Sequence, residues 1–366
     1  MTETFRAPVL RQIGGRLEMT DVTLDPPGPD EVMVRMVASG VCHSCLHAMD
    51  GSHGGMPTPL VLGDEGAGVV ERVGESVADV AVGDHVVISW APSCGRCRFC
   101  AIGRPVLCRR KAPSPGTLLD GTTRLHVDGE PLYHFGPATY APLTVVHASA
   151  AVPIRRDLPL DVAAMIGCAV ATGVGAVVNT SGARLGSSVA VFGCGGVGLN
   201  AIQGALLVGA HPIVAVDVID DRLALAARLG ATHVVRADDH DAPGRLRAIT
   251  GEGFDVTVLA VGVIAAFEQA WTATGAGGTC VVVGRTPDGE RTVFNPQTIH
   301  TGEKRLVGSI YGSVRPSVDF PKLADLAADG RLLLEEMVTS RYRLDEANAA
   351  FDDLAAGGLD RGLIIF

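Results

Sequence analysis

The chain has 366 residues, of which 47% are hydrophobic and 19% are charged. This length predicts two domains, or one domain interrupted by another, and the composition excludes an intrinsically disordered chain or a charged coiled coil. A formal net charge of -10 and an aromatic content of 4% argue against a nucleic-acid or anionic-membrane partner.

Neither an export signal nor a membrane span is expected. The first twenty residues contain no apolar run, so no signal peptide is predicted. Two uncharged or nearly uncharged stretches, Val162–Val178 and Val189–Ala210, are rich in Gly, which favours buried elements over membrane helices. We therefore expect a cytoplasmic protein.

The N-terminal part of the chain has an irregular, β-rich pattern. Strands are predicted at Glu31–Ala38, Gly68–Val73 and His85–Trp90, with Gly and Pro turns between them. Reactive side chains gather in two short segments of this part. Gly40–His47 contains thiols, imidazoles and a hydroxyl, and Gly63–Gly66 contains two adjacent carboxylates.

Four cysteines lie close together in a segment that cannot form an apolar core. Cys94, Cys97, Cys100 and Cys108 have the spacing C-x2-C-x2-C-x7-C within a stretch rich in Gly and Arg. Four thiolates around one Zn²⁺ would fold such a segment, and a site filled by four protein ligands has no position open for chemistry. The spacing therefore predicts a structural zinc; an iron–sulfur cluster and four free thiols are the alternatives. The following residues, 116–135, are expected to form a long surface loop.

A nucleotide-binding pattern begins near residue 185. A β-rich run, Ser188–Phe192, precedes Gly193-Cys194-Gly195-Gly196-Val197-Gly198, and a helical stretch follows. This is the G-x-G-x-x-G fingerprint in its strand–turn–helix context, where the helix N-terminus binds a pyrophosphate. Six strands alternate with helices, which predicts a doubly wound parallel sheet. The six are Ser188–Phe192, Ile213–Val216, Thr232–Val235, Phe254–Ala260, Gly278–Gly284 and Arg305–Ile310.

Asp217 ends the second of these strands. Its carboxylate is placed to accept the hydroxyls of an adenine ribose and to repel a 2′-phosphate, which favours NAD over NADP. The alternative is that Asp217 only caps the helix predicted at Asp220–Leu229.

The order of these motifs resembles that of zinc-dependent medium-chain alcohol dehydrogenases. C-H-S-x-x-H from Cys42, G-x-E-G-A-G-V-V from Gly63, the four-cysteine segment, G-C-x-x-x-T-G from Gly167 and the glycine fingerprint follow one another as in that family. The resemblance extends to Asp360-Arg361-Gly362 and is greatest to the branch of class III, formaldehyde-active enzymes and actinobacterial nicotinoproteins.

The resemblance implies a catalytic zinc bound by Cys42, Asp64 and Cys168. The family usually has His at the position of Asp64, and an aspartate that orients this His at the position of Cys45. A carboxylate has no N–H to donate, so an acid at position 45 would only repel Asp64. Glu65 matches an alternate ligand or a residue behind the ligands. The alternative is a site that binds zinc weakly or not at all.

The resemblance also assigns roles around the reaction, which is hydride transfer between an alcohol and NAD. Ser44 matches the hydroxyl that contacts the substrate oxygen, and His47 the outer histidine of a proton relay. Cofactor contacts are implied for His43, Thr172, Arg222 and Arg361, and substrate-pocket positions for Trp90 and Phe135.

The implied fold is α/β: a GroES-like β-rich catalytic domain with an inserted doubly wound six-stranded Rossmann domain. The expected boundaries are 1–169, 170–308 and 309–366, the last completing the catalytic domain. The expected function is a zinc- and NAD-dependent dehydrogenase acting on a small alcohol/aldehyde or ketone pair, as a homodimer or a tetramer. The alternatives are a reductase of an iminium or conjugated C=C substrate, and a dinucleotide-binding protein without activity.

Overall fold

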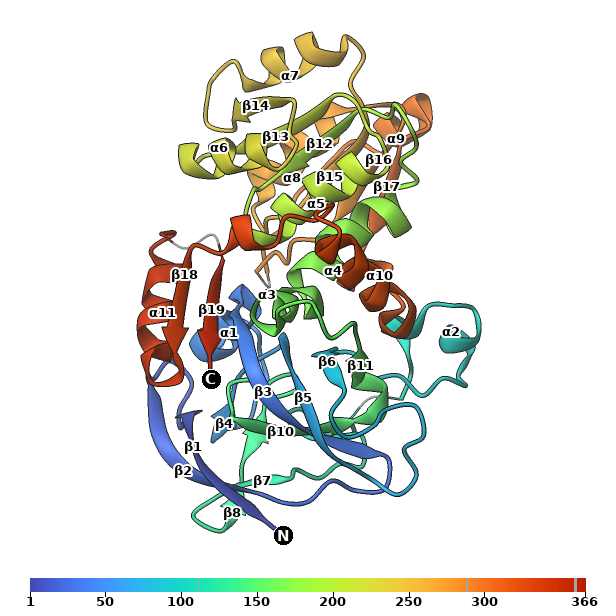
Figure 1. Ribbon diagram of the computed structural model, residues 1–366. Helices are drawn as coiled ribbons and strands as arrows, with labels where there is room; N and C mark the ends of the chain where they lie inside the picture. The colour runs from blue at the N-terminus through green and yellow to red at the C-terminus, as the bar shows by residue number, and fades with distance from the viewer. Residues whose placement is uncertain (111, 288, 359–360) are drawn as a thin grey trace. The chain divides into compact units, whose positions relative to one another are not determined.

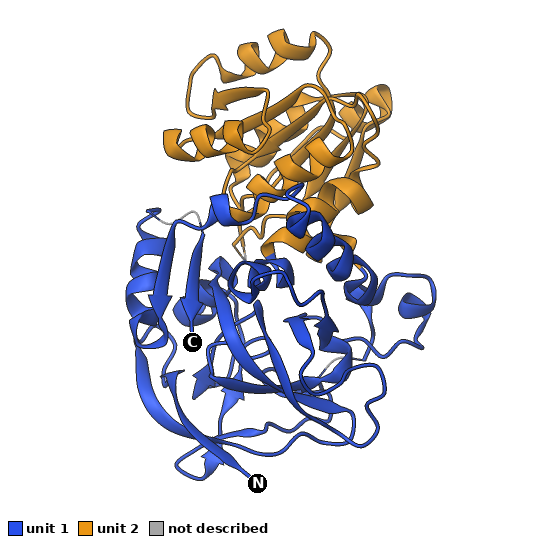
Figure 2. Cartoon of the chain, in the orientation of Figure 1, with its two compact units in different colours: residues 1–168, 315–366 blue, residues 169–314 orange. Residues whose placement is uncertain are grey.

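The computed structural model describes residues 1–110, 112–287, 289–358 and 361–366. These residues form two compact units. Unit 1 contains residues 1–168 and 315–366, and unit 2 contains residues 169–314 (Figure 2). Unit 1 is therefore assembled from both ends of the chain.

Two sheets form the framework of unit 1. The first has the strand order β8-β7-β2-β1-β4-β9, and the second has the order β11-β6-β5-β3-β19-β18, with β10 also paired to β3. The strands are β1 (Glu3–Leu10), β2 (Leu17–Leu24), β3 (Glu31–Val41), β4 (Leu60–Val61), β5 (Gly66–Val73), β6 (His85–Ile88), β7 (Leu125–Val127), β8 (Glu130–Pro131), β9 (Tyr133–His134), β10 (Leu143–His147), β11 (Ala151–Pro153), β18 (Ser340–Arg343) and β19 (Gly362–Ile365).

The helices of unit 1 are short except near the C-terminus. They are α1 (His43–Asp50), α2 (Arg98–Ala101), α3 (Leu160–Ala163), α10 (Pro316–Ala328) and α11 (Ala347–Ala355). In Figure 1, α11 lies beside β18 and β19, and its apolar residues Phe351 and Leu354 belong to the same core cluster as β1 and β4.

The C-terminal strand completes the sheet that begins at the N-terminus. β19 runs antiparallel to β3, with Gly362 opposite Val41 and Leu363 opposite Gly40. Because β3 ends directly before the segment that carries Cys42, this pairing brings Arg361, the residue before β19, to the same end of β3. The C-terminal strand thus belongs to unit 1, while the domain boundaries expected from the sequence stay predictions. Asp360, part of the C-terminal motif, lies outside the described residues.

Unit 2 is a six-stranded parallel sheet with the order β14-β13-β12-β15-β16-β17. In chain order the strands therefore lie 3-2-1-4-5-6, the doubly wound arrangement that the alternating pattern predicts. Its elements are α4 (Ala169–Gly175), β12 (Val189–Phe192), α5 (Gly196–Leu207), β13 (Ile213–Asp217), α6 (Asp220–Arg228), β14 (His233–Arg236), α7 (Ala242–Thr250), β15 (Phe254–Leu259), α8 (Ile264–Ala273), β16 (Thr274–Val282), α9 (Gln297–Gly302) and β17 (Arg305–Gly308) (Figure 1).

The segment 116–135 is not the long loop expected from the sequence. It contains β7 and β8, which form an antiparallel hairpin, and the whole of β9. The hairpin turns at Asp128-Gly129, where φ is 54° and 81°. Positive φ at both central residues is the property of a two-residue type I′ turn, for which Asp-Gly is a favoured sequence.

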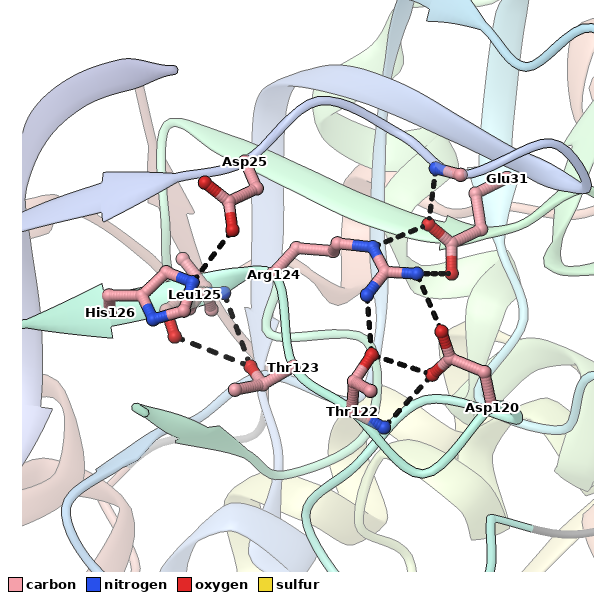
Figure 3. Close-up of polar contacts among 9 residues, drawn as sticks. Asp25, Glu31, Asp120, Thr122, Thr123, Arg124, Leu125 and His126 are labelled. Carbon is pink, nitrogen blue, oxygen red and sulfur yellow. Dashed lines mark hydrogen bonds and ion pairs between the residues drawn. The ribbon is translucent and has the colours of Figure 1, made fainter. Parts of the chain in front are cut away.

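Arg124 anchors the start of this hairpin through a cluster of polar contacts (Figure 3). Its guanidinium donates two hydrogen bonds to the buried Glu31, at 2.9 and 3.0 Å, and one to Asp120, at 2.6 Å. The same Glu31 accepts from the backbone N–H of Gly28. Burial alone would raise the pKa of Asp120, but the N–H of Thr122 and the guanidinium lower this pKa to about 2. Arg124 thus forms ion pairs with two carboxylates at once.

Among the described residues, no single helix is long and apolar enough to cross a membrane. One bent pair of helical segments, Leu160–Gly167 with Ala169–Ser181, reaches the required length and composition together.

Replacing Arg124 by Met is expected to lower the free energy of unfolding by about 2–3 kcal/mol, because Glu31 would stay buried without its charged partner. Urea denaturation measures this change. The control is Arg6→Met, which removes an exposed pair with Asp21 and should change stability by less than about 0.5 kcal/mol. Equal stability of the two variants would show that the Arg124 cluster stabilises nothing.

Candidate active site

Cys42 lies between β3 and α1. It precedes the first helical residue with extended backbone angles, φ -108° and ψ 142°, and its carbonyl accepts the N–H groups of Cys45 and Leu46. This first turn of α1 points Cys45 into the apolar core cluster that also contains Cys42 and Phe135. His43 lies on the exposed side of the helix.

Asp64 and Glu65 lie between β4 and β5, and neighbouring hydroxyls hold their backbone. Ser39 Oγ and Thr139 Oγ1 donate to the Glu65 carbonyl at 2.8 and 3.0 Å. Both carboxylates are buried. The third candidate ligand, Cys168, follows directly after a short 3-10 segment at Ala164–Gly167.

Cys42, Asp64 and Cys168 form a candidate metal centre within unit 1. One ligand atom from each lies within 4.8 Å of the others, and Cys168 Sγ is 3.7 Å from Asp64 Oδ2. Two thiolates and a carboxylate are a donor set that suits Zn²⁺, and three protein ligands leave a fourth position open. The residues present therefore fit a catalytic zinc.

The two cysteines of this centre affect each other's protonation. The Cys168 thiol, through a hydrogen bond to the Cys42 sulfur, lowers the pKa of Cys42. The same bond and burial raise the pKa of Cys168. Cys42 is thus the thiol that ionises first, and the thiolate is the form that binds a metal.

Glu65 faces Arg361. The two form an ion pair in which both side chains are buried, and Arg361 Nη1 lies 3.5 Å from the Val41 carbonyl. A Cβ atom on residue 40 would overlap the Glu65 carboxylate, so Gly40 makes room for this pair. The ligand role expected for Glu65, and the pyrophosphate contact expected for Arg361, stay predictions.

The other residues expected around the substrate lie in unit 1. Ser44 Oγ is 3.5 Å from Cys42 Sγ, and His47 follows one turn later on α1, with its ring 6.3 Å from that of His43. Phe135 is buried and meets His53 edge to face, and Trp90 is partly buried.

Cys94, Cys97, Cys100 and Cys108 form a second candidate metal centre. Three sulfur–sulfur distances are 3.5, 3.6 and 3.9 Å. A tetrahedral zinc with Zn–S bonds of about 2.3 Å has sulfurs about 3.8 Å apart, so this cluster has the size of a closed zinc site. The pKa of Cys97 is lowered to about 6 by backbone N–H groups, the largest effect coming from Arg109.

The surroundings of this second centre are basic. No acidic residue occurs between His85 and Leu119, and five arginines of the segment are exposed. Four thiolates around one Zn²⁺ carry a charge of about -2, which these arginines offset. They are Arg96, Arg98, Arg104, Arg109 and Arg110.

The glycine fingerprint of unit 2 lies between β12 and α5. Gly193 has φ 89°, a conformation that favours glycine. A Cβ on Gly198 would overlap the Gly193 carbonyl, whereas a Cβ on Gly195 would meet no atom within 4 Å. The turn is therefore tightly packed beneath Gly198 and open above Gly195, the side from which a pyrophosphate would approach.

Asp217 ends β13 as expected, but neighbouring N–H groups already occupy its carboxylate. Oδ2 accepts from Cys194 at 2.6 Å, and Oδ1 accepts from Val218 and Ile219 just before α6. Two carboxylate oxygens have about four acceptor positions, so one remains for a ribose hydroxyl. These contacts agree with a ribose acceptor. They do not satisfy the first N–H groups of α6, because Val218 and Ile219 precede its first residue, Asp220. Thr172 lies buried in α4, and Arg222 lies in α6.

Two contacts were missed from the sequence. Cys45, interpreted there as an uncharged replacement for an acid, has its Sγ 3.3 Å from Asp64 Oδ1, and burial raises its pKa well above the usual range. Tyr140 donates its hydroxyl to the Gly40 carbonyl at 3.1 Å. The position of Cys45 three residues after Cys42 placed it near that ligand, but no local pattern reported its contact with Asp64.

Replacing Cys97 by Ala is expected to release about one zinc per chain, because the segment has almost no apolar core of its own. The loosened segment should then be cut by trypsin after its exposed arginines. Metal analysis and limited proteolysis check both effects. Cys280→Ala, a buried cysteine of unit 2, is the control. A Cys97→Ala protein with unchanged zinc content and protease resistance would contradict a structural metal here.

Comparisons with known proteins match this arrangement. Residues 28–156 match the model of the alcohol dehydrogenase GroES-like domain, and residues 196–329 match that of the zinc-binding dehydrogenases. An NDMA-dependent alcohol dehydrogenase of Amycolatopsis methanolica is 36% identical and covers 98% of each chain. A class-3 alcohol dehydrogenase of Cereibacter sphaeroides is 36% identical and covers 99% of each. The crystal structure of an alcohol dehydrogenase zinc-binding domain protein from Burkholderia ambifaria has a TM-score of 0.96 and 36% identity over 100% of both chains. The chain therefore belongs to the zinc-binding alcohol dehydrogenase family.

Proposed function

We propose that this protein is a zinc-dependent oxidoreductase that transfers a hydride between NAD(H) and a small alcohol/aldehyde or ketone pair. The observation that carries the proposal is the group of the buried Cys42 and Asp64 with the partly exposed Cys168, a zinc donor set with one position left open. Family membership supports the reaction class, and the relatives are themselves named alcohol dehydrogenases.

When bound, a zinc ion would polarise the carbon–oxygen bond and a nicotinamide ring would exchange the hydride. Cys42, Asp64 and Cys168 would hold the metal, and the Ser44 hydroxyl beside Cys42 would hydrogen-bond the substrate oxygen. His47, one helical turn further on, would pass the proton to solvent, a task for which histidine is suited near neutral pH. A second, structural zinc would bind the four thiols at Cys94–Cys108.

We propose NAD rather than NADP as the cofactor. Asp217 is buried at the end of β13 and keeps one acceptor position for a ribose hydroxyl. A 2′-phosphate at the same place would bring its charge against a carboxylate that cannot move away without losing three N–H donors. His43, Thr172, Arg222 and Arg361 are the further cofactor contacts that we propose.

We further propose a cytoplasmic homodimer with the domains 1–169, 170–308 and 309–366. In support of self-association, β17 ends the parallel sheet of unit 2 and carries Leu306, which is 38% exposed. An exposed edge strand has unpaired backbone groups that a second copy can satisfy.

Metal analysis of the purified protein, combined with turnover assays, tests the function. Two zinc per chain with alcohol-dependent NADH formation supports it. One zinc with reduction of an iminium or conjugated C=C bond supports the alternative reductase, in which proton delivery matters more than Lewis acidity. One zinc with NAD binding and no turnover would point to a dinucleotide-binding protein without activity.

Replacing Asp64 by His is expected to shift the optimum of alcohol oxidation to lower pH by about one unit. With two thiolates and a carboxylate as ligands, a zinc site would have a net charge of -1. With an imidazole in place of the carboxylate the site would be neutral, and it would lower the pKa of the substrate alcohol further. The measurement is kcat/KM against pH. Asp21→His, an exposed acid far from the site in sequence, is the control. An unchanged profile would rule out Asp64 as a ligand.

Replacing Asp217 by Asn is expected to lower kcat/KM with NAD and to raise the ratio of NADP to NAD activity by about tenfold, since the repulsion of the 2′-phosphate is removed while the volume is kept. Initial rates with both cofactors measure this ratio. Asp255→Asn is the control, because this acid also accepts backbone and hydroxyl groups in unit 2, from Ser188. If both variants lose activity with NAD equally and the ratio stays constant, Asp217 only holds the backbone between β13 and α6.

A further inference from the structure

We propose that Cys45 is a positioning residue: its thiol donates a hydrogen bond to one oxygen of Asp64, so that Asp64 binds the metal through the other oxygen alone. The inference rests on the proposed function, because it assumes a metal at Cys42, Asp64 and Cys168. It gives position 45 a donor that suits a carboxylate ligand, where the family has an acceptor that suits the N–H of an imidazole ligand.

The two oxygens of Asp64 face different partners. Oδ1 lies 3.3 Å from Cys45 Sγ, and Oδ2 lies 3.7 Å from Cys168 Sγ, on the side of the candidate metal centre. Cys45 is fully buried and Asp64 is 4% exposed, so water does not compete for Oδ1. At this distance, in an apolar environment, a thiol can donate a hydrogen bond to a carboxylate oxygen.

Cys45 is placed as a donor and not as a further ligand. The ligand atoms that lie within 4.8 Å of one another in this part of the described chain come from Cys42, Asp64 and Cys168, without Cys45. A third thiolate beside the carboxylate would also take the net charge of a zinc-bound site from -1 to -2. As a neutral thiol, Cys45 instead relieves the charge on Asp64.

The backbone links this hydrogen bond to the ligands. The N–H of Cys45 donates to the Cys42 carbonyl at 3.1 Å, so one helical turn of α1 holds the Cys42 ligand and the thiol that orients the Asp64 ligand. A carboxylate binds cations through one or two oxygens. If the thiol occupies Oδ1, Asp64 contributes one donor atom, and the fourth position stays open for substrate.

Three variants separate hydrogen bonding from packing. Cys45→Ser keeps a donor of similar size, Cys45→Val fills the space without a donor, and Cys45→Ala removes both. Cys280→Ala is the control, since this buried cysteine lies in unit 2. Circular dichroism and the zinc content of the four-cysteine centre establish that each variant is folded.

The measurements are metal affinity by competition with a chelator and the absorption spectrum of the cobalt-substituted protein. We expect Cys45→Val and Cys45→Ala to lower the metal affinity of the catalytic site by about 10–100-fold and to change its ligand-field bands. The metal affinity of Cys45→Ser should stay within about threefold of wild type. The sulfur-to-cobalt charge-transfer intensity should stay the same in all three, because both ligand thiolates remain.

Three results would overturn the inference. Unchanged metal affinity in Cys45→Val and Cys45→Ala would make Cys45 a packing residue. A lower charge-transfer intensity in Cys45→Ser would make Cys45 a ligand. In both cases the wild type still binds two metals and the proposed function stands. A wild-type protein that binds metal only in its four-cysteine centre would instead overturn both the inference and the proposed catalytic metal.

Discussion

The central constraint on this molecule is that its fold brings several acidic side chains close together in its interior. Cys42, Asp64 and Cys168 come from segments far apart in the sequence, yet their ligand atoms lie within 4.8 Å of one another. Such groups repel one another and lose hydration when they are buried, which costs several kcal/mol for each charge. A fold that holds them together must be compensated by a cation or by retained protons. The hydrogen bond between the two sulfurs lowers the pKa of Cys42 and raises the pKa of Cys168, so the two thiols differ in how readily they lose a proton.

Glu65 meets the same constraint in a different way. It lies directly beside Asp64, but its charge is balanced by Arg361, which reaches this place only because β19 pairs with the end of β3. The closure of unit 1 by the C-terminal strand therefore supplies the cation that a second buried carboxylate needs. Gly40, opposite Leu363 in that pairing, leaves the space for the Glu65 side chain. The strand pairing that closes unit 1 therefore also places the opposite charges of Arg361 and Glu65 beside each other.

The sequence predicted the features that depend on local pattern. The glycine fingerprint, Asp217 and the parallel sheet of unit 2 follow from strand–turn–helix periodicity, and the cysteine spacing predicted a cluster of suitable size. It failed at 116–135, where strands of two or three residues are too short to show alternation; the Asp128-Gly129 turn was the available signal. The contact of Cys45 with Asp64 joins positions 19 residues apart, and no local pattern reports it.

The two candidate metal centres both use cysteine ligands, but the four-cysteine centre is the more exposed of the two. The four cysteines at 94–108 lie in a segment with exposed arginines and few apolar contacts, so a metal there would replace a missing core and needs all four ligands from the protein. At the centre formed by Cys42, Asp64 and Cys168, Cys42 belongs to an apolar core cluster and Cys168 packs against it. Only such a centre can leave a coordination position unfilled, because the surrounding core, and not the metal, holds its ligands in place.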